Sequence, residues 1–213
     1  MLVDLPGFGN TPLSYFQDLP DLANQLYRQV RNQDIAKVTL IGHSLGGYVA
    51  MELLRQYPDF CEGLVLFHAS ALEDPEERKK IRQVYLDAFD RFGGDFFLRN
   101  FHENLFQDPS HKSIDSLKTY NDQISVETLQ QYTQAMKDRG GYEDLLLSDI
   151  PKMLICGAFD QSISTDDYQK MYNRSKNCEL TVLPNSAHMG MLEEPFQASQ
   201  RILSFIKELN PKG

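Results

Sequence analysis

The sequence has few cysteines, no long apolar run and no excess of basic residues. Cys61, Cys156 and Cys178 are odd in number and far apart, which favours buried thiols in a reducing compartment and offers no metal-ligand spacing. No stretch approaches the ~20 apolar residues of a membrane-spanning helix. The net charge of −9 argues against a nucleic-acid partner, which normally requires a basic face. We therefore expect a cytoplasmic protein with no nucleic-acid or membrane partner, and with neither a metal nor another cofactor.

Short strand patterns alternate with helical patterns along the chain. Runs that are apolar on both faces predict parallel strands over 37–41, 63–67, 152–156 and 179–183. Met1-Leu2-Val3 has the character of the tail of a further buried strand. Apolar residues at spacings of three and four predict helices over 18–32, 45–57 and 195–209. The alternation predicts an α/β fold, with a mostly parallel sheet covered by helices on both faces.

One long interval, residues 69–148, has no strand pattern and predicts helices over 76–92, 94–104, 111–122 and 126–139. We therefore predict a discontinuous core of residues 1–68 and 149–213, with 69–148 as a helical cap or lid. Two interpretations of the aromatic residues in this insertion stay open: they form its own core, or some line an apolar substrate pocket. These residues are Tyr85, Phe89, Phe92, Phe96, Phe97, Phe101 and Phe106.

The stretch Gly42-His43-Ser44-Leu45-Gly46-Gly47 follows a predicted strand and opens a predicted helix. This context is that of the G-x-S-x-G nucleophile elbow, in which a strained turn lifts the serine Oγ clear of the sheet. Side chains two residues before and after Ser44 are expected to collide, so glycine is expected to be required at 42 and 46. Because a serine hydroxyl is a poor nucleophile, the motif also predicts a base and an orienting acid.

The acid and the base are expected in the order Ser, acid, His, each just past the end of a strand. Asp160 follows the predicted strand 152–156, and His188 follows the strand 179–183. We predict Ser44 as nucleophile, Asp160 as acid and His188 as base. Asp166 and Asp167, ahead of the next helix, remain rivals for the acid.

The other histidines receive different expectations. His43 flanks the nucleophile and is expected to pack beneath the site without reacting. His68 ends the strand beside the elbow strand and is a candidate for lining the substrate pocket. His102 and His111 lie in the insertion without partners that the sequence identifies.

Four stretches, residues 4–9, 40–47, 157–160 and 186–195, together resemble the α/β-hydrolase family and its capped, esterase-like branch. The resemblance runs from residue 1 to about 209 and is least specific over 69–148. It implies a serine hydrolase, carboxylesterase-like (EC 3.1), acting on a small-molecule acyl substrate. Related members include carrier-protein methyl-ester esterases, C–C bond hydrolases and lactonases. Epoxide hydrolases and haloalkane dehalogenases use an aspartate nucleophile, so Ser44 argues against them.

By this resemblance, Ser44 attacks an acyl carbon, His188 takes its proton and Asp160 holds the imidazole. The backbone N–H of Leu45 is expected to bind the oxyanion. The family's second donor comes from a His-Gly loop after an earlier strand, and nothing here corresponds to it. We therefore expect the middle of a longer protein (a truncated gene product, a mis-called start or a fragment), with a compact natural variant as the alternative.

Two consequences follow from that expectation. Exposed sheet edges favour self-association, and one missing oxyanion donor lowers turnover by about 10²–10³. Activity is expected to rise with pH as His188 loses its proton. Two further hypotheses stay open, a non-catalytic binding protein on a hydrolase scaffold and an inert fragment.

Overall fold

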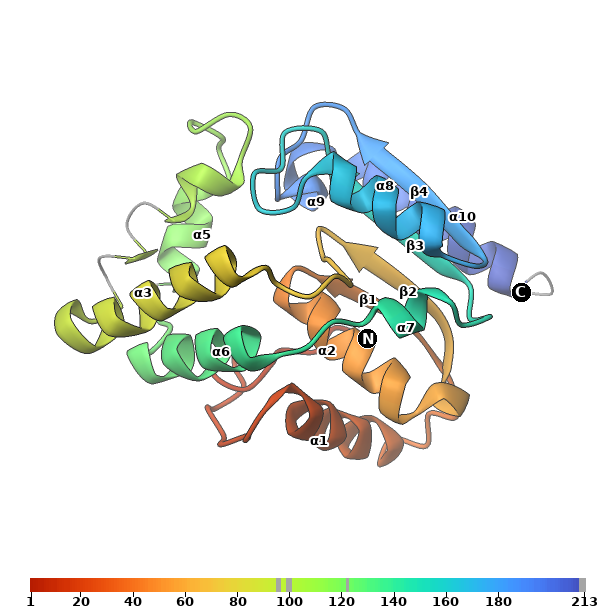
Figure 1. Cartoon of the computed structure of the whole chain (residues 1–213), viewed down its shortest axis with the longest axis horizontal. Coiled ribbons are helices and arrows are strands. Elements are labelled where there is room, and N and C mark those ends of the chain that lie inside the picture. Colours follow the sequence, from red (N-terminus) through yellow and green to blue (C-terminus); the bar gives the residue numbers. More distant parts are fainter. Residues whose placement is uncertain (95–96, 99–100, 122, 211–213) are drawn as a thin grey trace. The chain divides into compact units, whose positions relative to one another are not determined.

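The computed structural model describes residues 1–94, 97–98, 101–121 and 123–210. The chain divides into two compact units (Figure 1). Unit 1 comprises Met1–Asp18, Asp74–Asn104 and Asp108–Gly140, and unit 2 comprises Leu19–Glu73, Leu105–Gln107 and Gly141–Gly213. The grouping differs from the predicted boundaries at four places: residues 1–18 group with the helical insertion, and residues 69–73, 105–107 and 141–148 group with the sheet.

Unit 2 is built on a four-stranded parallel sheet of order β1-β2-β3-β4. Its strands are β1 (Val38–His43), β2 (Cys61–Phe67), β3 (Lys152–Gly157) and β4 (Cys178–Leu183). Each strand covers a predicted apolar run to within two residues at either end. The predicted α/β class and the mostly parallel sheet are therefore confirmed.

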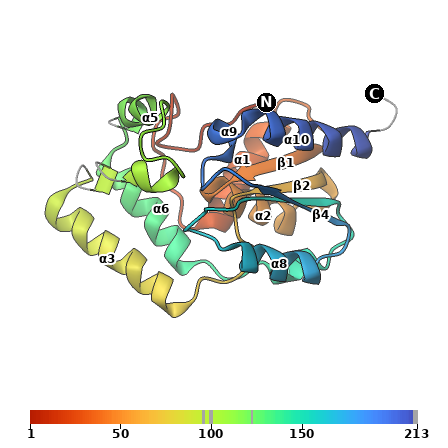
Figure 2. The ribbon, with the colours of Figure 1, turned by 90° about the horizontal axis from the view of Figure 1, so that it is seen from above.

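The two central strands carry apolar side chains to both faces of the sheet. Val65, Phe67, Met153 and Ile155 share one face and pack with Ala198 and Phe205 of α10 (Pro195–Leu209). Gly63 permits this close approach, because an added Cβ would lie 2.5 Å from Leu209. Helix α8 (Thr165–Arg174) lies on the sheet face opposite α10 (Figure 2). Burial of each large apolar side chain contributes roughly 1.5–3 kcal/mol, so both faces stabilise the unit.

Three predicted helices of unit 2 form at the predicted positions, and shorter ones accompany them. Helix α1 (Leu19–Arg31) packs on α2 (Leu45–Gln56), which ends one residue before Tyr57 and the 3₁₀ turn η1 (Pro58–Phe60). The sequence pattern does not indicate the one-turn helices α7 (Glu143–Leu146) and α9 (Gly190–Glu193). They are too short to show a helical period.

Unit 1 contains α3 (Glu76–Phe92), α5 (Ile114–Asn121) and α6 (Val126–Asp138), and α3 packs on α6. The 3₁₀ turn η2 (Glu103–Leu105) begins in the segment Asp74–Asn104 of unit 1 and ends at Leu105, which belongs to unit 2. The helix predicted over 94–104 falls partly on residues 95–96 and 99–100, which lie outside the described residues. Helix α6 begins at a capped N-terminus, because Ser125 Oγ accepts the Thr128 N–H at 3.2 Å.

The N-terminal segment belongs to unit 1 through contacts with α6. The Tyr132 hydroxyl donates to the Pro6 carbonyl at 3.0 Å, and the Tyr132 ring contacts Phe8 and Phe16. Met1-Leu2-Val3 is not a strand, and its residues are 72%, 100% and 41% exposed. The predicted strand tail is wrong because a strand needs a ladder partner, and these residues pair with none of the four strands in the described part of the chain.

The aromatic residues of the insertion pack largely on one another. The Phe97 ring lies 5.0 Å from Tyr85, 5.4 Å from Phe89 and 4.6 Å from Phe101. These contacts support the interpretation that the rings form the insertion's own core. Phe92 is exposed, Phe106 is buried, and Phe96 lies outside the described residues.

Among the described residues, none of the helices has both the length and the apolar character needed to cross a bilayer.

Candidate active site

Ser44 lies in the turn between β1 and α2 with φ 49° and ψ −116°. A positive φ is uncommon for a residue other than glycine, so this backbone is strained as the elbow motif predicts. The Ser44 N–H donates to the Phe67 carbonyl at 2.9 Å, which fastens the turn to the end of β2. A Cβ on Gly42 would overlap the Gly46 carbonyl oxygen and lie 2.5 Å from Gly47 Cα, so Gly42 is required by sterics.

The second glycine constraint differs from the prediction. A Cβ at Gly46 would meet nothing within 4 Å outside its own helix, so the expected collision there is wrong. A Cβ at Gly47 would instead overlap the Cβ of Ala69. The reason is the direction of α2, which turns position 47, not position 46, toward the segment after β2.

Ser44, His188 and Asp160 meet at the ends of three strands. Ser44 Oγ lies 2.9 Å from His188 Nε2, and His188 Nδ1 lies 2.8 Å from Asp160 Oδ2. The three side chains follow β1, β4 and β3, whose carboxyl ends share one edge because the strands are parallel. The predicted rivals Asp166 and Asp167 lie in the first turn of α8, and Asp167 pairs with Lys170.

The Asp160 carboxylate receives four hydrogen bonds. Oδ1 accepts the backbone N–H groups of Ser162 at 2.8 Å and Ile163 at 3.3 Å. Oδ2 accepts from His188 and, at 3.0 Å, from His68. Burial by itself raises the pKa of Asp160, but the imidazole N–H groups of His188 and His68 outweigh it and hold the pKa below its usual range. Asp160 is therefore an anion at neutral pH.

An anionic Asp160 determines the tautomer of the neutral His188 ring. A carboxylate only accepts, so His188 donates its Nδ1–H and leaves the Nε2 lone pair facing the Ser44 hydroxyl. Ser44 then donates its O–H to Nε2. This arrangement can remove the serine proton and return it to a leaving group.

The loop that carries His188 is held by contacts that the sequence pattern does not indicate. Glu193 Oε2 accepts the N–H groups of Ala187 at 2.9 Å and Met189 at 3.2 Å, on either side of His188. The His188 N–H itself donates to the Leu105 carbonyl at 2.9 Å. Glu193 stands five residues after His188 in the sequence and two residues before Pro195, which starts a helix. An acidic residue at such a place indicates only that a helix begins nearby, so the sequence pattern does not show that Glu193 holds the His188 loop.

The remaining predicted residues take distinct places. The His43 Nε2 donates to the His188 carbonyl at 2.9 Å, and its ring lies 5.2 Å from the His188 ring. Burial first, and then the neighbouring His188, lower the pKa of His43 to about 3. His68 is fully buried and bonds Asp160, so its side chain does not face open space. Leu45 is the first residue of α2, where backbone N–H groups have no intrahelical acceptor.

His102 and His111 belong to unit 1. The hydrogen-bonded relay of Ser44, His188 and Asp160 lies in unit 2. His102 is buried, and His111 Nδ1 accepts the Ser113 N–H at 3.2 Å.

Asp160, His68 and His188 also bring nitrogen and oxygen atoms of metal-ligand type within 4.8 Å of one another. Two imidazoles and a carboxylate are a common ligand set for transition metals. Here both Nδ1 atoms already donate their protons to the carboxylate, so hydrogen bonding accounts for the cluster.

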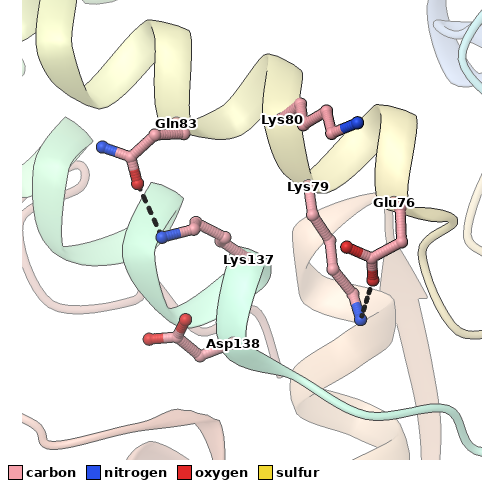
Figure 3. A pocket seen from close by; sticks show the side chains of 6 residues that line it. All are labelled: Glu76, Lys79, Lys80, Gln83, Lys137 and Asp138. Carbon is pink, nitrogen blue, oxygen red and sulfur yellow. Dashed lines mark hydrogen bonds and ion pairs between the residues drawn. The ribbon is translucent and has the colours of Figure 1, made fainter.

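Unit 1 has an open hollow of about 380 Å³ between α3 and α6, shown in Figure 3. Charged and amide side chains line it, and they pair with one another: Lys79 with Glu76 at 3.2 Å, and Lys137 with Gln83 at 2.6 Å. All of its lining residues carry a charged or amide group, whereas small-molecule sites are typically lined by hydrophobic and aromatic residues.

Comparison with known proteins agrees with this architecture. The chain is 28% identical over 214 residues to the dihydrolipoyllysine-residue acetyltransferase component of an acetoin cleaving system from Pseudomonas putida, an alignment that covers 97% of this chain and 55% of that protein. It therefore spans about half the length of that relative. It is 23% identical over 218 residues to a pimeloyl-[acyl-carrier protein] methyl ester esterase from Yersinia enterocolitica, covering 98% of this chain and 83% of that protein.

Among solved structures, a thermophilic esterase from Thermogutta terrifontis superposes with a TM-score of 0.88 at 25% identity, covering 97% of this chain and 78% of that one. The model of the alpha/beta hydrolase family matches residues 1–199, a range that includes the elbow, the acid and the base. A match of that extent, on a parallel sheet whose strand ends bring the three side chains together, makes this chain a member of the alpha/beta hydrolase family.

Proposed function

We propose that this chain is a serine hydrolase that cleaves a carboxylic ester or related acyl bond of a small apolar substrate through an acyl-enzyme. The observation that carries the proposal is the hydrogen-bonded series from Ser44 through His188 to Asp160. Its three members come from separate loops and have the order and the hydrogen-bond directions that nucleophilic catalysis requires.

In the first half-reaction, Ser44 Oγ attacks the acyl carbon while His188 Nε2 takes the hydroxyl proton. The carbonyl π electrons move to oxygen, and the imidazolium that forms is stabilised by the Asp160 carboxylate. The oxyanion then reforms the carbonyl, the C–O bond to the alcohol breaks, and His188 gives its proton to the departing oxygen. The products of this half are the free alcohol and an ester of Ser44.

In the second half-reaction, water replaces the alcohol. His188 takes a proton from water, the resulting hydroxide oxygen attacks the acyl carbon, and the second tetrahedral oxyanion collapses. The C–O bond to Ser44 breaks, His188 returns the proton to Oγ, and the carboxylic acid departs. In both halves the Leu45 N–H, at the N-terminus of α2, is the proposed oxyanion donor.

The nature of the relatives supports ester chemistry. The Yersinia protein is described as a methyl ester esterase, and the Thermogutta protein as an esterase. The proposal carries that bond type to this chain, together with the expectation that the substrate is a small molecule. Self-association through the edge strands β1 and β4 remains a separate proposal from the sequence.

The proposal is tested by covalent labelling and turnover. The purified protein should take up one fluorophosphonate on Ser44, located by peptide mass spectrometry, and should release nitrophenol from short nitrophenyl esters. Ser44→Ala should lose the label and at least about 10³-fold in kcat/KM, since nucleophile and base act as a unit. Ser199→Ala, at an exposed position on α10, is the matched control and should keep both.

Two outcomes would contradict the proposal. Ester turnover by Ser44→Ala at the parent rate would place the chemistry elsewhere. A folded parent chain that neither takes the label nor releases nitrophenol would instead support the alternative of a non-catalytic binding protein on this scaffold.

A further inference from the structure

His68 is a second imidazole bound to the same carboxylate oxygen as His188. Its Nδ1 lies 3.0 Å from Asp160 Oδ2, and its side chain is fully buried between the ends of β2 and β3. A Ser-His-Asp relay requires one histidine on its carboxylate, which is His188 here. The relay alone therefore does not explain why His68 also donates to Asp160.

The hydrogen-bond partners of His68 determine its protonation. The Gly190 backbone N–H donates to His68 Nε2 at 3.2 Å, so this nitrogen is an unprotonated acceptor. The remaining proton is on Nδ1 and is donated to Asp160. A second proton on Nε2 would face the Gly190 N–H, donor against donor, and burial also lowers the pKa of His68. His68 is therefore a neutral donor and does not compete with His188 as a base.

The two bonds connect the acid to the loop of the base. Gly190 begins α9, two residues after His188, and a Cβ on it would lie 2.6 Å from His68 Nε2. His68 thus bridges from Asp160 to the segment that follows His188. Its own backbone has φ 49°, a strained conformation that points to a constrained position at the end of β2.

Sharing one oxygen changes how strongly Asp160 interacts with His188. Each N–H bonded to Oδ2 withdraws part of the negative charge, so the His68 donor weakens the attraction between Asp160 and a protonated His188. Without His68, that imidazolium would be more stable, and His188 would remain protonated, and inactive as a base, to a higher pH.

We propose that His68 is a positioning residue that aligns Asp160 toward His188 and, by sharing Oδ2, lowers the pH at which His188 becomes an active base. The proposal rests on the proposed function of Ser44 and adds a residue that touches neither substrate nor reacting atoms.

Other titratable groups face this cluster and do not change between the variants below. They are His43 at the end of β1, Cys156 in β3, Tyr168 in α8 and Glu193 in α9. Burial and the nearby Asp160 raise the pKa of the Cys156 thiol to about 12, so it is uncharged at the pH of the experiments.

Two substitutions separate the two bonds of His68. In His68→Asn the carboxamide nitrogen takes the place of Nδ1, which keeps a donor for Asp160 and loses the acceptor for Gly190. In His68→Gln the carboxamide oxygen takes the place of Nε2, which keeps the acceptor for Gly190 and loses the donor for Asp160. Asparagine also tolerates the positive φ of this position better than most residues.

The measurement is the pH dependence of kcat/KM with a nitrophenyl ester. His68→Gln should move the midpoint of the rise to higher pH by roughly 0.5–1 unit. His68→Asn should keep the midpoint of the parent, with any loss of rate equal at every pH. A purely structural role would lower the rate or the stability of both variants and leave both midpoints unchanged, which would overturn the proposal.

A second measurement uses the unmodified chain and does not depend on activity or on the folding of a variant. Side-chain ¹⁵N NMR of histidine-labelled protein should show His68 as the neutral Nδ1–H tautomer from pH 5 to 8. A protonated His68, or an Nε2–H tautomer, would contradict the proposal even if Ser44 is the nucleophile. Absence of ester turnover with the expected His68 tautomer would instead contradict the proposed function alone.

Discussion

At the residue scale, the ends of β1–β4 gather three imidazoles around one carboxylate. Asp160 accepts hydrogen bonds from His188 and His68, while His43 donates to the His188 carbonyl. Desolvation lowers the pKa of both His43 and His68, so these rings stay neutral at pH 7. The negative charge of Asp160 is buried among them, and its four hydrogen bonds compensate for the lost water.

The half-buried His43 leads to a prediction about stability and pH. In the folded chain its pKa is about 3, against an ordinary value of 6.5, so between these values the unfolded chain binds a proton that the folded chain does not. Stability is therefore full above pH 6.5 and falls on acidification, by about 2 kcal/mol at pH 5 from this group. His43→Gln keeps a donor for the His188 carbonyl but does not titrate. Urea unfolding at pH 7.5 and 5 should show a smaller loss for His43→Gln; equal losses would contradict the lowered pKa.

At the element scale, the junction of β1 with α2 is determined by close backbone approach. Gly42 and Gly47 are the positions where a Cβ would overlap neighbouring atoms, and Gly46 is not. The difference arises because position 47 of α2 faces Ala69 beyond β2, while position 46 has space around it. A motif of spaced glycines therefore does not tell which of them the packing requires.

This difference predicts opposite effects of one substitution at adjacent positions. Gly47→Ala should lower the free energy of unfolding by about 1–3 kcal/mol, the usual range for overpacking. Gly46→Ala should leave it unchanged or raise it by about 0.5–1 kcal/mol, because alanine favours a helix over glycine. Denaturant midpoints of the two variants check this. Equal destabilisation at both positions would mean that the elbow, not the contact with Ala69, imposes the requirement.

The short helix α9 matters at the same scale, because Glu193 at its end holds the His188 loop. Replacing it by alanine removes acceptors from the Ala187 and Met189 N–H groups and lets His188 shift away from Ser44. We expect Glu193→Ala to lower kcat/KM by about 10- to 100-fold, since small misplacements of reacting groups have effects of that size. Glu208→Ala is the control, because that exposed carboxylate bonds Ser204 on α10, and its kcat/KM should match the parent. A parent-like Glu193→Ala would show that the Leu105 contact alone holds the loop.

At the scale of the whole molecule, each unit has its own stabilising centre. Unit 2 has the sheet and the apolar cluster beneath α10. Unit 1 has, besides its aromatic rings, a buried ion cluster in which Asp74 binds Arg82 at 2.8 Å and also Arg139. Units with separate cores are expected to lose structure separately.

The ion cluster gives a test of that independence. Asp74→Ala leaves two arginines without their shared carboxylate, and such a loss destabilises by about 3–5 kcal/mol. Limited proteolysis with peptide mapping should show faster cleavage in α3 and α6, while β1–β4 remain protected. Asp87→Ala, at an exposed position on α3, should match the parent. Equal loss of protection in the sheet of unit 2 would show that the two units unfold together.

The sequence by itself determined the α/β class, the four strands, most of the longer helices and the side chains of the relay. It could do so because apolar periodicity is local, and because parallel strands bring their carboxyl ends, and hence Ser44, Asp160 and His188, to one edge. Only the tertiary structure decided that His68 shares Asp160, that Glu193 and Leu105 hold the His188 loop, and that residues 1–18 pack on α6. These contacts join residues of ordinary local pattern, some of them about ninety positions apart, and only three-dimensional packing selects such pairs.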